Sequence, residues 1–190
     1  MGTSGAKALQ SLGFLTVIED DQHGLFGGYL LLNIAGRPLE FHCTAPIKPN
    51  RAQQILYGPT LEPYLYGEQI AQTLVSKAKV EPLVLFTDRA PVVAVREYIQ
   101  VPIGLVLSDN DQQKADGRKL EDPLNQEQSS RSSTFLIGRN RVGVAATYPD
   151  DRSMIEERLR PSGDLFNLVE PFQRIRDAIE EARGGGSKAA

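Results

Sequence analysis

The chain has 190 residues, which suits one domain and is long enough to bury a core without disulfides or structural metals. Hydrophobic residues make up 41% and charged residues 24%, and these ordinary values argue against wholesale disorder. With a formal net charge of −3, the chain lacks the strongly basic overall balance typical of nucleic-acid-binding proteins, and a local basic patch is still compatible with this charge.

The sequence shows neither a secretory signal nor a membrane span, and we expect a cytoplasmic protein with no membrane partner. The longest apolar stretch, "GLFGGYLLLNIAG", is far shorter than the roughly 20 residues that cross a bilayer. Cys43 is the only cysteine, so no internal disulfide can form. A zinc site from His23, His42 and Cys43 has no recognised spacing, and we interpret Cys43 as a small, buried apolar residue of a strand.

Three runs rich in β-forming residues open the chain, at 12–19, 25–33 and 38–45. The third run alternates apolar and polar residues, which predicts one buried and one wet face and places His42 on the wet one. Short, turn-forming connections join the runs. We therefore predict a three-stranded antiparallel meander.

The middle of the chain predicts two helices. Asn50 and Gln53 form the pattern of a capping box, which opens a short helix over 51–57. A glycine and a proline end it. Thr60 then resembles the N-cap of a second helix that continues to about residue 77.

An apolar stripe along this second helix predicts the face that packs on the sheet. At the helical period its members are Tyr64, Gly67, Ile70, Ala71, Leu74 and Ala78. Glu68 lies at the edge of the stripe, at the boundary between core and water.

Further strands follow at 81–88 and 101–107, and the near-continuous apolar run of the first is typical of a central parallel strand. Residues 89–100 fit either a short helix or a strand. Residues 108–133 contain only three apolar residues, which predicts a polar, mobile insertion; a lid over a site is the alternative interpretation.

The C-terminal part predicts a hairpin around Arg139-Asn140 and then helices at 150–159 and 171–183. Gly184 has the position of a C-cap, and residues 184–190 read as a flexible tail.

Together these elements predict one α/β domain over residues 1–183. Its mixed sheet would hold the antiparallel meander, followed by a helix, further strands and the C-terminal helices.

Carboxylates follow several predicted strands. Asp20 and Asp21 end the first strand, Asp88 ends the fourth, and Asp109 and Asp111 follow the fifth. If these strands are parallel, their carboxyl ends meet at one edge, where open α/β sheets bind ligands. Mg²⁺ prefers such oxygen ligands and could activate water against a phosphodiester, with Asp20 and Asp88 as the metal ligands.

The order strand–strand–strand–helix–strand–helix–strand over about 12–107 resembles that of the ribonuclease H fold, in which the meander leads into a helix that supplies a glutamate. The resemblance implies that Glu68 takes this role, beside Asp20 or Asp21 and Asp88. It also implies a Mg²⁺-dependent phosphodiester or phosphoryl hydrolase with nucleic acid as a partner. The sequence departs from that pattern in two ways, since its first acid ends the strand and its helix is broken.

A second resemblance, to receiver domains, rests on "VIEDD" and "LVLFTD", which are similar to the acidic strand ends of that family. A receiver has a helix directly after its first strand, whereas a hairpin pattern follows here. This departure argues against a receiver domain.

Two functional hypotheses remain. We favour a non-catalytic binding or assembly module without a cofactor, because the chain has no G-x-S-x-G, H-E-x-x-H or comparable motif. Tyr57, Tyr64 and Tyr66, expected to be exposed, would engage a protein partner or a second copy of the chain, and the C-terminal helix is the alternative contact surface. The alternative is the Mg²⁺-dependent hydrolase with Asp20, Asp21, Glu68 and Asp88. Acids are also common after strands simply because turns need polar residues.

Overall fold

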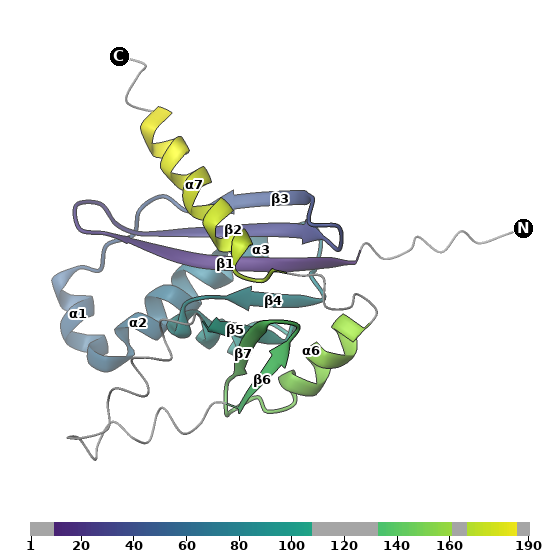
Figure 1. Ribbon diagram of the computed structural model, residues 1–190. Coiled ribbons are helices and arrows are strands. Elements are labelled where there is room, and N and C mark those ends of the chain that lie inside the picture. The colour runs from purple at the N-terminus through teal and green to yellow at the C-terminus, as the bar shows by residue number, and fades with distance from the viewer. Residues whose placement is uncertain (1–9, 108–132, 161–166, 186–190) are drawn as a thin grey trace, which may run out of the picture.

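The computed structural model describes residues 10–107, 133–160 and 167–185. A seven-stranded sheet in the order β3-β2-β1-β4-β5-β7-β6 lies between two layers of helices (Figure 1). The predicted α/β class is confirmed, with an antiparallel meander, a mixed sheet and C-terminal helices. Nearly all of the predicted polar insertion and most of the predicted tail lie outside the described residues.

The meander consists of β1 (Ser11–Asp20), β2 (Gly24–Asn33) and β3 (Pro38–Cys43). β1 pairs with β2 over its full length and β2 pairs with β3, both antiparallel, as predicted. β1 and β2 are buried along most of their length because helices cover both faces of the sheet.

Parallel strands continue the sheet from the other edge of β1. β4 (Val84–Thr87) pairs with β1, and β5 (Ile103–Leu107) pairs with β4. The segment between β4 and β5 contains the 3₁₀ helix η3 (Ala90–Glu97). The sequence of this segment fits a short helix and a strand equally well, and the structure shows the helix. The parallel strands β1, β4 and β5 thus have their carboxyl ends at the same edge of the sheet.

The far edge is a hairpin of β6 (Ser133–Ile137) and β7 (Asn140–Val144), with β7 antiparallel to β5. Its turn holds Gly138 and Arg139, one residue earlier than the predicted turn. Gly138 has φ 56°, a conformation that favours glycine, and this explains the position of the turn.

The helical middle begins with α1 (Arg51–Tyr57), whose predicted capping box between Asn50 and Gln53 is present. A continuous helical run follows, made of η1 (Gly58–Thr60), α2 (Leu61–Pro63), η2 (Tyr64–Gln72) and α3 (Thr73–Lys77). The prediction that Thr60 caps this run is wrong, because its hydroxyl donates to the Tyr57 carbonyl instead.

η2 is a π-helix, and its geometry changes which residues face the sheet. The predicted stripe is buried at Gly67, Ile70, Ala71 and Leu74, but Leu65 and Tyr66 are buried too. A π-helix has a wider turn than an α-helix, so successive side chains advance by a smaller angle. The α-helical period therefore predicts too narrow a buried face.

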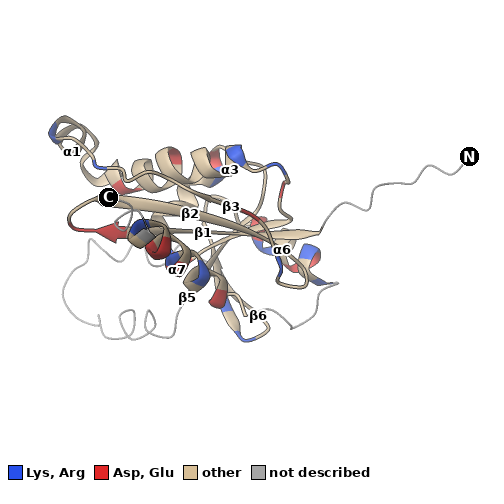
Figure 2. Ribbon diagram, turned by 90° about the horizontal axis from the view of Figure 1, so that it is seen from above, with Lys and Arg blue, Asp and Glu red and all other residues tan. Residues whose placement is uncertain are grey.

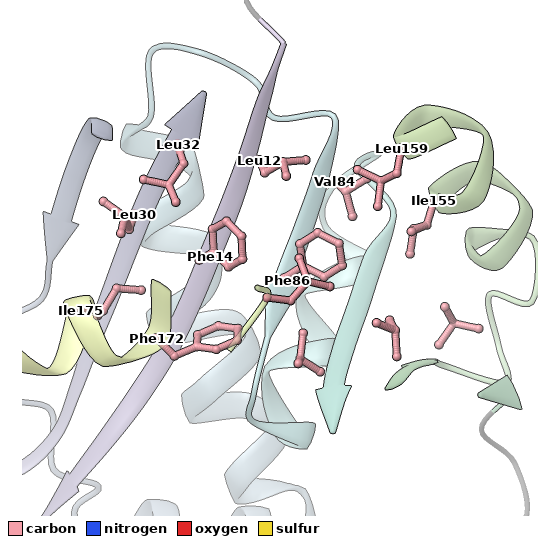
Figure 3. Packing of buried hydrophobic residues seen from close by; sticks show 14 of the residues in the cluster. Leu12, Phe14, Leu30, Leu32, Val84, Phe86, Ile155, Leu159, Phe172 and Ile175 are labelled. Atoms are coloured by element: carbon pink, nitrogen blue, oxygen red, sulfur yellow. The ribbon is translucent and has the colours of Figure 1, made fainter. Parts of the chain in front are cut away.

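Two hydrophobic clusters fill the space on either side of the sheet. Side chains from β1, β2 and β4 pack on one face against α6 (Asp151–Leu159) and α7 (Glu170–Gly185), as Figure 3 shows for Phe14, Phe86 and Phe172. On the other face, Leu15 and its neighbours pack against η2, α3 and η3. α7 continues through Gly185, so the predicted C-cap at Gly184 is wrong.

Two adjacent glycines in β2 let helices approach the sheet closely on both faces. A Cβ atom at Gly27 would lie 2.1 Å from Cγ2 of Ile70 in η2, and one at Gly28 would lie 2.2 Å from Cγ2 of Ile175 in α7. Because successive residues of a strand point to opposite faces, the pair serves one helix on each side.

A buried ion pair joins η3, α6 and β5. Asp151 is buried and accepts hydrogen bonds from Nε of Arg96 at 2.9 Å and from the backbone N–H of Ile103 at 3.1 Å. Buried carboxylates need such partners because an unpaired charge in the core is costly.

Candidate functional site

Thr16, Asp88 and Arg176 meet where β1, β4 and α7 come together. Thr16 Oγ1 donates to Oδ1 of Asp88 at 2.6 Å, and the guanidinium of Arg176 pairs with Oδ2 of the same carboxylate. The strand register explains the contact, because Leu15 pairs with Thr87 and the next residues of the two parallel strands are neighbours. The carboxylate is thus paired with a cation that the chain itself supplies.

Asp20 lies in a separate cluster at the β1–β2 turn. It accepts hydrogen bonds from the backbone N–H groups of Gln22 and His23, at 3.0 and 2.7 Å, and it pairs with Arg183 of α7. The backbone N–H of His23, and after it Arg183, holds the pKa of the Asp20 carboxyl well below its usual range. Asp21 is exposed in the same turn.

The structure does not bring Asp20 and Asp88 together. β1 continues beyond its last pair with β4, whereas Asp88 directly follows the end of β4. Asp20 lies four residues beyond Thr16, which is roughly 13 Å along a strand that rises about 3.3 Å per residue. Both strands end in acids, but β1 extends five residues further along the shared strand direction than its last pair with β4.

Glu19 leaves β1 on the opposite face from Asp20, because side chains of a strand alternate. It accepts a hydrogen bond from Tyr66 Oη at 2.7 Å and lies 3.8 Å from Nη1 of Arg89. Burial first, and then the bond to Glu19, raises the pKa of the Tyr66 phenol. The expectation that Tyr66 is exposed is wrong, since only 5% of it is accessible.

A cavity of about 320 Å³ opens at the carboxyl ends of β4 and β5. Its charged lining consists of Glu19, Glu62, Asp88 and Arg89, and its apolar wall comes from β5 and the start of η3. This is the end of the sheet at which open α/β folds bind ligands. The cavity is the first candidate site.

The carboxylates of the described residues do not fit a Mg²⁺ site. No three His, Cys, Asp or Glu side chains within 10–107, 133–160 and 167–185 are placed to hold a metal ion. Asp20 and Asp88 each contact a guanidinium instead. Asp109 and Asp111 lie outside the described residues.

The described residues also provide no zinc site from His23, His42 and Cys43. His42 pairs with Glu40 at 3.0 Å, and His23 contacts Asp20 at 2.8 Å. Cys43, interpreted as a buried apolar residue, is exposed, because β3 is an edge strand with a partly open face.

A second candidate site is the surface of α1. Ile55 and Leu56 are 66% and 82% exposed, and none of the helix is buried by the described parts of the chain. Tyr57 stacks on Tyr64 with ring centroids 4.1 Å apart and planes inclined by 23°. We call Ile55, Leu56, Tyr57 and Tyr64 the α1 surface; α1 lies at the end of the molecule where β1 turns into β2 (Figures 1 and 2).

Glu68 belongs to this second region and not to the strand ends. Its Oε2 accepts a hydrogen bond from Tyr98 Oη at 3.2 Å. Desolvation and the Glu68 carboxylate raise the pKa of Tyr98. A hydrogen bond with Tyr64, then desolvation, then the nearby charges raise the pKa of Tyr57.

Sequence reasoning missed Thr16, Arg176 and Tyr98. The signal for Thr16 was a hydroxyl within an apolar strand, on the face that also carries Phe14. Arg176 directly follows a residue of the apolar stripe of α7, so it lies beside the buried face. Tyr98 lies within residues 89–100, for which the sequence favours neither helix nor strand.

No known family model matches the chain, and no curated protein matches it. Solved structures that are similar include human endonuclease V, with 14% identity, a TM-score of 0.46, and coverage of 93% of this chain and 87% of that one. Another is Ciona intestinalis endonuclease V in complex with a DNA that contains inosine followed by a ribo-adenosine. It has 11% identity and a TM-score of 0.47, and the match covers 91% of this chain and 87% of that one. A third is the catalytic domain of human endonuclease V, with 16% identity, a TM-score of 0.44, and coverage of 94% of this chain and 85% of that one. At TM-scores below 0.5 these similarities assign no activity to this chain.

Among the described residues, no helix is both long and apolar enough to cross a membrane.

Proposed function

We propose that this chain is a non-catalytic module that binds a protein partner through the α1 surface. The observation that carries the proposal is the exposure of Ile55 and Leu56 on a helix that none of the described residues buries. Aromatic residues such as Tyr57 and Tyr64 are enriched at protein interfaces, and the fully buried centre of an interface is more apolar than the rest of the surface.

α1 gains little stability from the rest of the described chain. It has seven residues, well below the ~12–15 at which an isolated helix becomes marginally stable in water. The capping box at its start and the stack of Tyr57 on Tyr64 hold it in place. A partner that covers Ile55 and Leu56 would bury the apolar face that the helix leaves open.

The arrangement of the carboxylates supports a role without catalysis. A metal-dependent hydrolase needs several acids free to share a cation. Here Arg176 pairs with Asp88 and Arg183 pairs with Asp20. Figure 2 shows acidic and basic segments along α7, the helix that supplies both arginines.

Site-specific photo-crosslinking tests the proposal. A photoreactive amino acid replaces Leu56 in the full chain, and a matched control carries it at Glu180, which is exposed on α7. After irradiation in an extract of the source cells, we expect one protein to crosslink from position 56 only. The Ile55→Ser substitution should reduce that yield. Equal crosslinking from both positions would contradict the proposal.

A second candidate function is hydrolysis of a phosphodiester at the carboxyl ends of the parallel strands. The cavity lined by Glu19, Glu62 and Asp88 favours it, because ligands of open α/β sheets bind at this end. The order of strands and helices from β1 to β5 also follows the order that resembles the ribonuclease H fold.

A thermal melt with and without Mg²⁺ or Mn²⁺ tests this candidate. A metal that binds the native state raises the melting temperature by mass action. The candidate predicts a rise at millimolar metal that Asp88→Asn abolishes. No rise in the wild-type protein would exclude it.

A further inference from the structure

Tyr57, Tyr64, Tyr98 and Glu68 form a compact group at the edge of the α1 surface. Tyr57 comes from α1, Tyr64 and Glu68 come from η2, and Tyr98 directly follows η3. The stack of Tyr57 on Tyr64 and the bond from Tyr98 to Glu68 connect these elements. We call these four residues the tyrosine cluster.

The cluster is open to solvent. Tyr98 is 46% exposed, and the other three side chains are half-buried. They are therefore held in place by the fold and still within reach of a ligand. A site of this kind loses little entropy on binding, because its groups are already ordered.

The charge of the cluster has no balancing cation within the described chain. Glu68 makes no ion pair with a Lys, Arg or His of the residues described. The cation–π contacts found there lie on other rings, those of Tyr148, Phe135 and Phe26. Within the described residues, no Lys, Arg or His therefore pairs with the Glu68 carboxylate or lies over the rings of Tyr57, Tyr64 and Tyr98, although both kinds of group attract cations.

Carboxylates and aromatic faces favour the same kind of ligand. The face of an aromatic ring carries negative electrostatic potential and attracts ammonium and guanidinium groups. Glu68 adds a full negative charge that can accept a charge-assisted hydrogen bond. Tyr57 and Tyr64 add flat rings, on which a planar guanidinium can stack.

We propose that the tyrosine cluster binds a cationic side chain, lysine or arginine, of the protein partner that covers the α1 surface. This inference rests on the proposed function and names the chemistry of the partner. The aliphatic pair Ile55 and Leu56 contacts the apolar part of that partner, and Glu68 with the rings selects its positive charge.

Small-molecule probes test the inference without the partner. N-acetyl-arginine amide, N-acetyl-lysine amide and the neutral N-acetyl-norleucine amide are titrated into the full chain with isotope-labelled tyrosine rings. The chain has six tyrosines and no tryptophan, which keeps the ring spectrum simple. We expect the two cationic probes to shift the ring signals of Tyr57, Tyr64 and Tyr98, and the neutral probe to leave them unchanged.

Two variants identify the groups responsible. Glu68→Gln keeps the size of the side chain and one oxygen that can accept the bond from Tyr98 but removes the charge, and Tyr98→Leu removes one ring. Each should weaken binding of the cationic probes by roughly two- to fivefold, the factor that corresponds to a solvent-exposed cation–π contact. Glu180→Gln, which changes an exposed acid on α7, should leave binding unchanged.

Equal shifts from the neutral probe, or unchanged binding in both variants, would overturn the inference. The outcome is separable from that of the proposed function. Crosslinking from position 56 without binding of the cationic probes would reject the cationic ligand and keep the protein partner. Binding of the probes without crosslinking would reject the partner surface and keep the cation site.

Discussion

Replacing Asp88 by Asn tests the ion pair that occupies the carboxyl end of β4. The substitution removes the charge that Arg176 faces and keeps an oxygen that can accept the hydrogen bond from Thr16. The side chain of Arg176 is 31% exposed and that of Asp88 is 19% exposed. The guanidinium can therefore recover part of its hydration in the variant.

The expected loss of stability lies between two limits. Exposed ion pairs contribute about 0–1 kcal/mol, whereas breaking a buried pair costs about 3–5 kcal/mol. For this partly exposed pair we expect the free energy of unfolding to fall by about 1–2 kcal/mol, after allowing for solvent screening. In a chain of this size the melting temperature should then fall by about 2–8 °C.

Thermal denaturation followed by circular dichroism measures this shift. Glu156→Gln is the matched control, because it neutralises one partner of an exposed ion pair with Arg152 on α6. The control should change stability by less than about 0.5 kcal/mol. If Asp88→Asn melted at the same temperature as the control, the claim that Arg176 holds this carboxylate would be refuted.

Three further predictions concern the packing of the fold. Asp151→Ala should destabilise the protein by about 3–5 kcal/mol in chemical denaturation, because it leaves the mostly buried guanidinium of Arg96 without its negative partner. Gly28→Ala should lower the melting temperature, since the new methyl group would lie 2.2 Å from Ile175, and unchanged stability would show that α7 is not held so closely. Spectrophotometric titration should find Tyr66 ionising above the usual value of about 10, because its folded-state pKa is raised. The associated stability is complete below about pH 10 and is lost as the pH rises above it, and a normal titration would contradict the burial of Tyr66.

The strands were predictable because their signals are local. The runs that became β1, β2 and β4 are apolar and bounded by turn residues, and the capping box of α1 spans only the four residues from Asn50 to Gln53. Each of these features depends on neighbours in the sequence. Local patterns therefore indicated the α/β class and the meander.

The π-helix was not predictable from periodicity. The α-helical period of 100° per residue places Tyr66 away from the stripe, whereas the wider turn of η2 buries it. Two consecutive residues, Leu65 and Tyr66, face inward beside Gly67. η2 packs against the sheet and against η3, and a periodic pattern within one segment contains neither contact.

The grouping of the carboxylates was also beyond the sequence, because it depends on register. Asp20 and Asp88 both end strands, but β4 stops opposite the middle of β1, and alternation sends Glu19 to the other face. The arginines that meet these acids come from α7, more than eighty residues further along the chain. The sequence shows which positions carry acids, but only the folded structure shows that Asp20 and Asp88 contact arginines of α7.

The most direct test of the central claim is the affinity for the crosslinked partner when the apolar pair of α1 is removed. Ile55 and Leu56 are replaced together by serine, and the dissociation constant is measured by calorimetry. Both side chains are mostly exposed, so the variant should keep its melting temperature within the range of surface substitutions. If these residues form the centre of the interface, the dissociation constant should rise by at least about 30-fold, which corresponds to about 2 kcal/mol. An unchanged dissociation constant would contradict the claim that the α1 surface binds a protein partner.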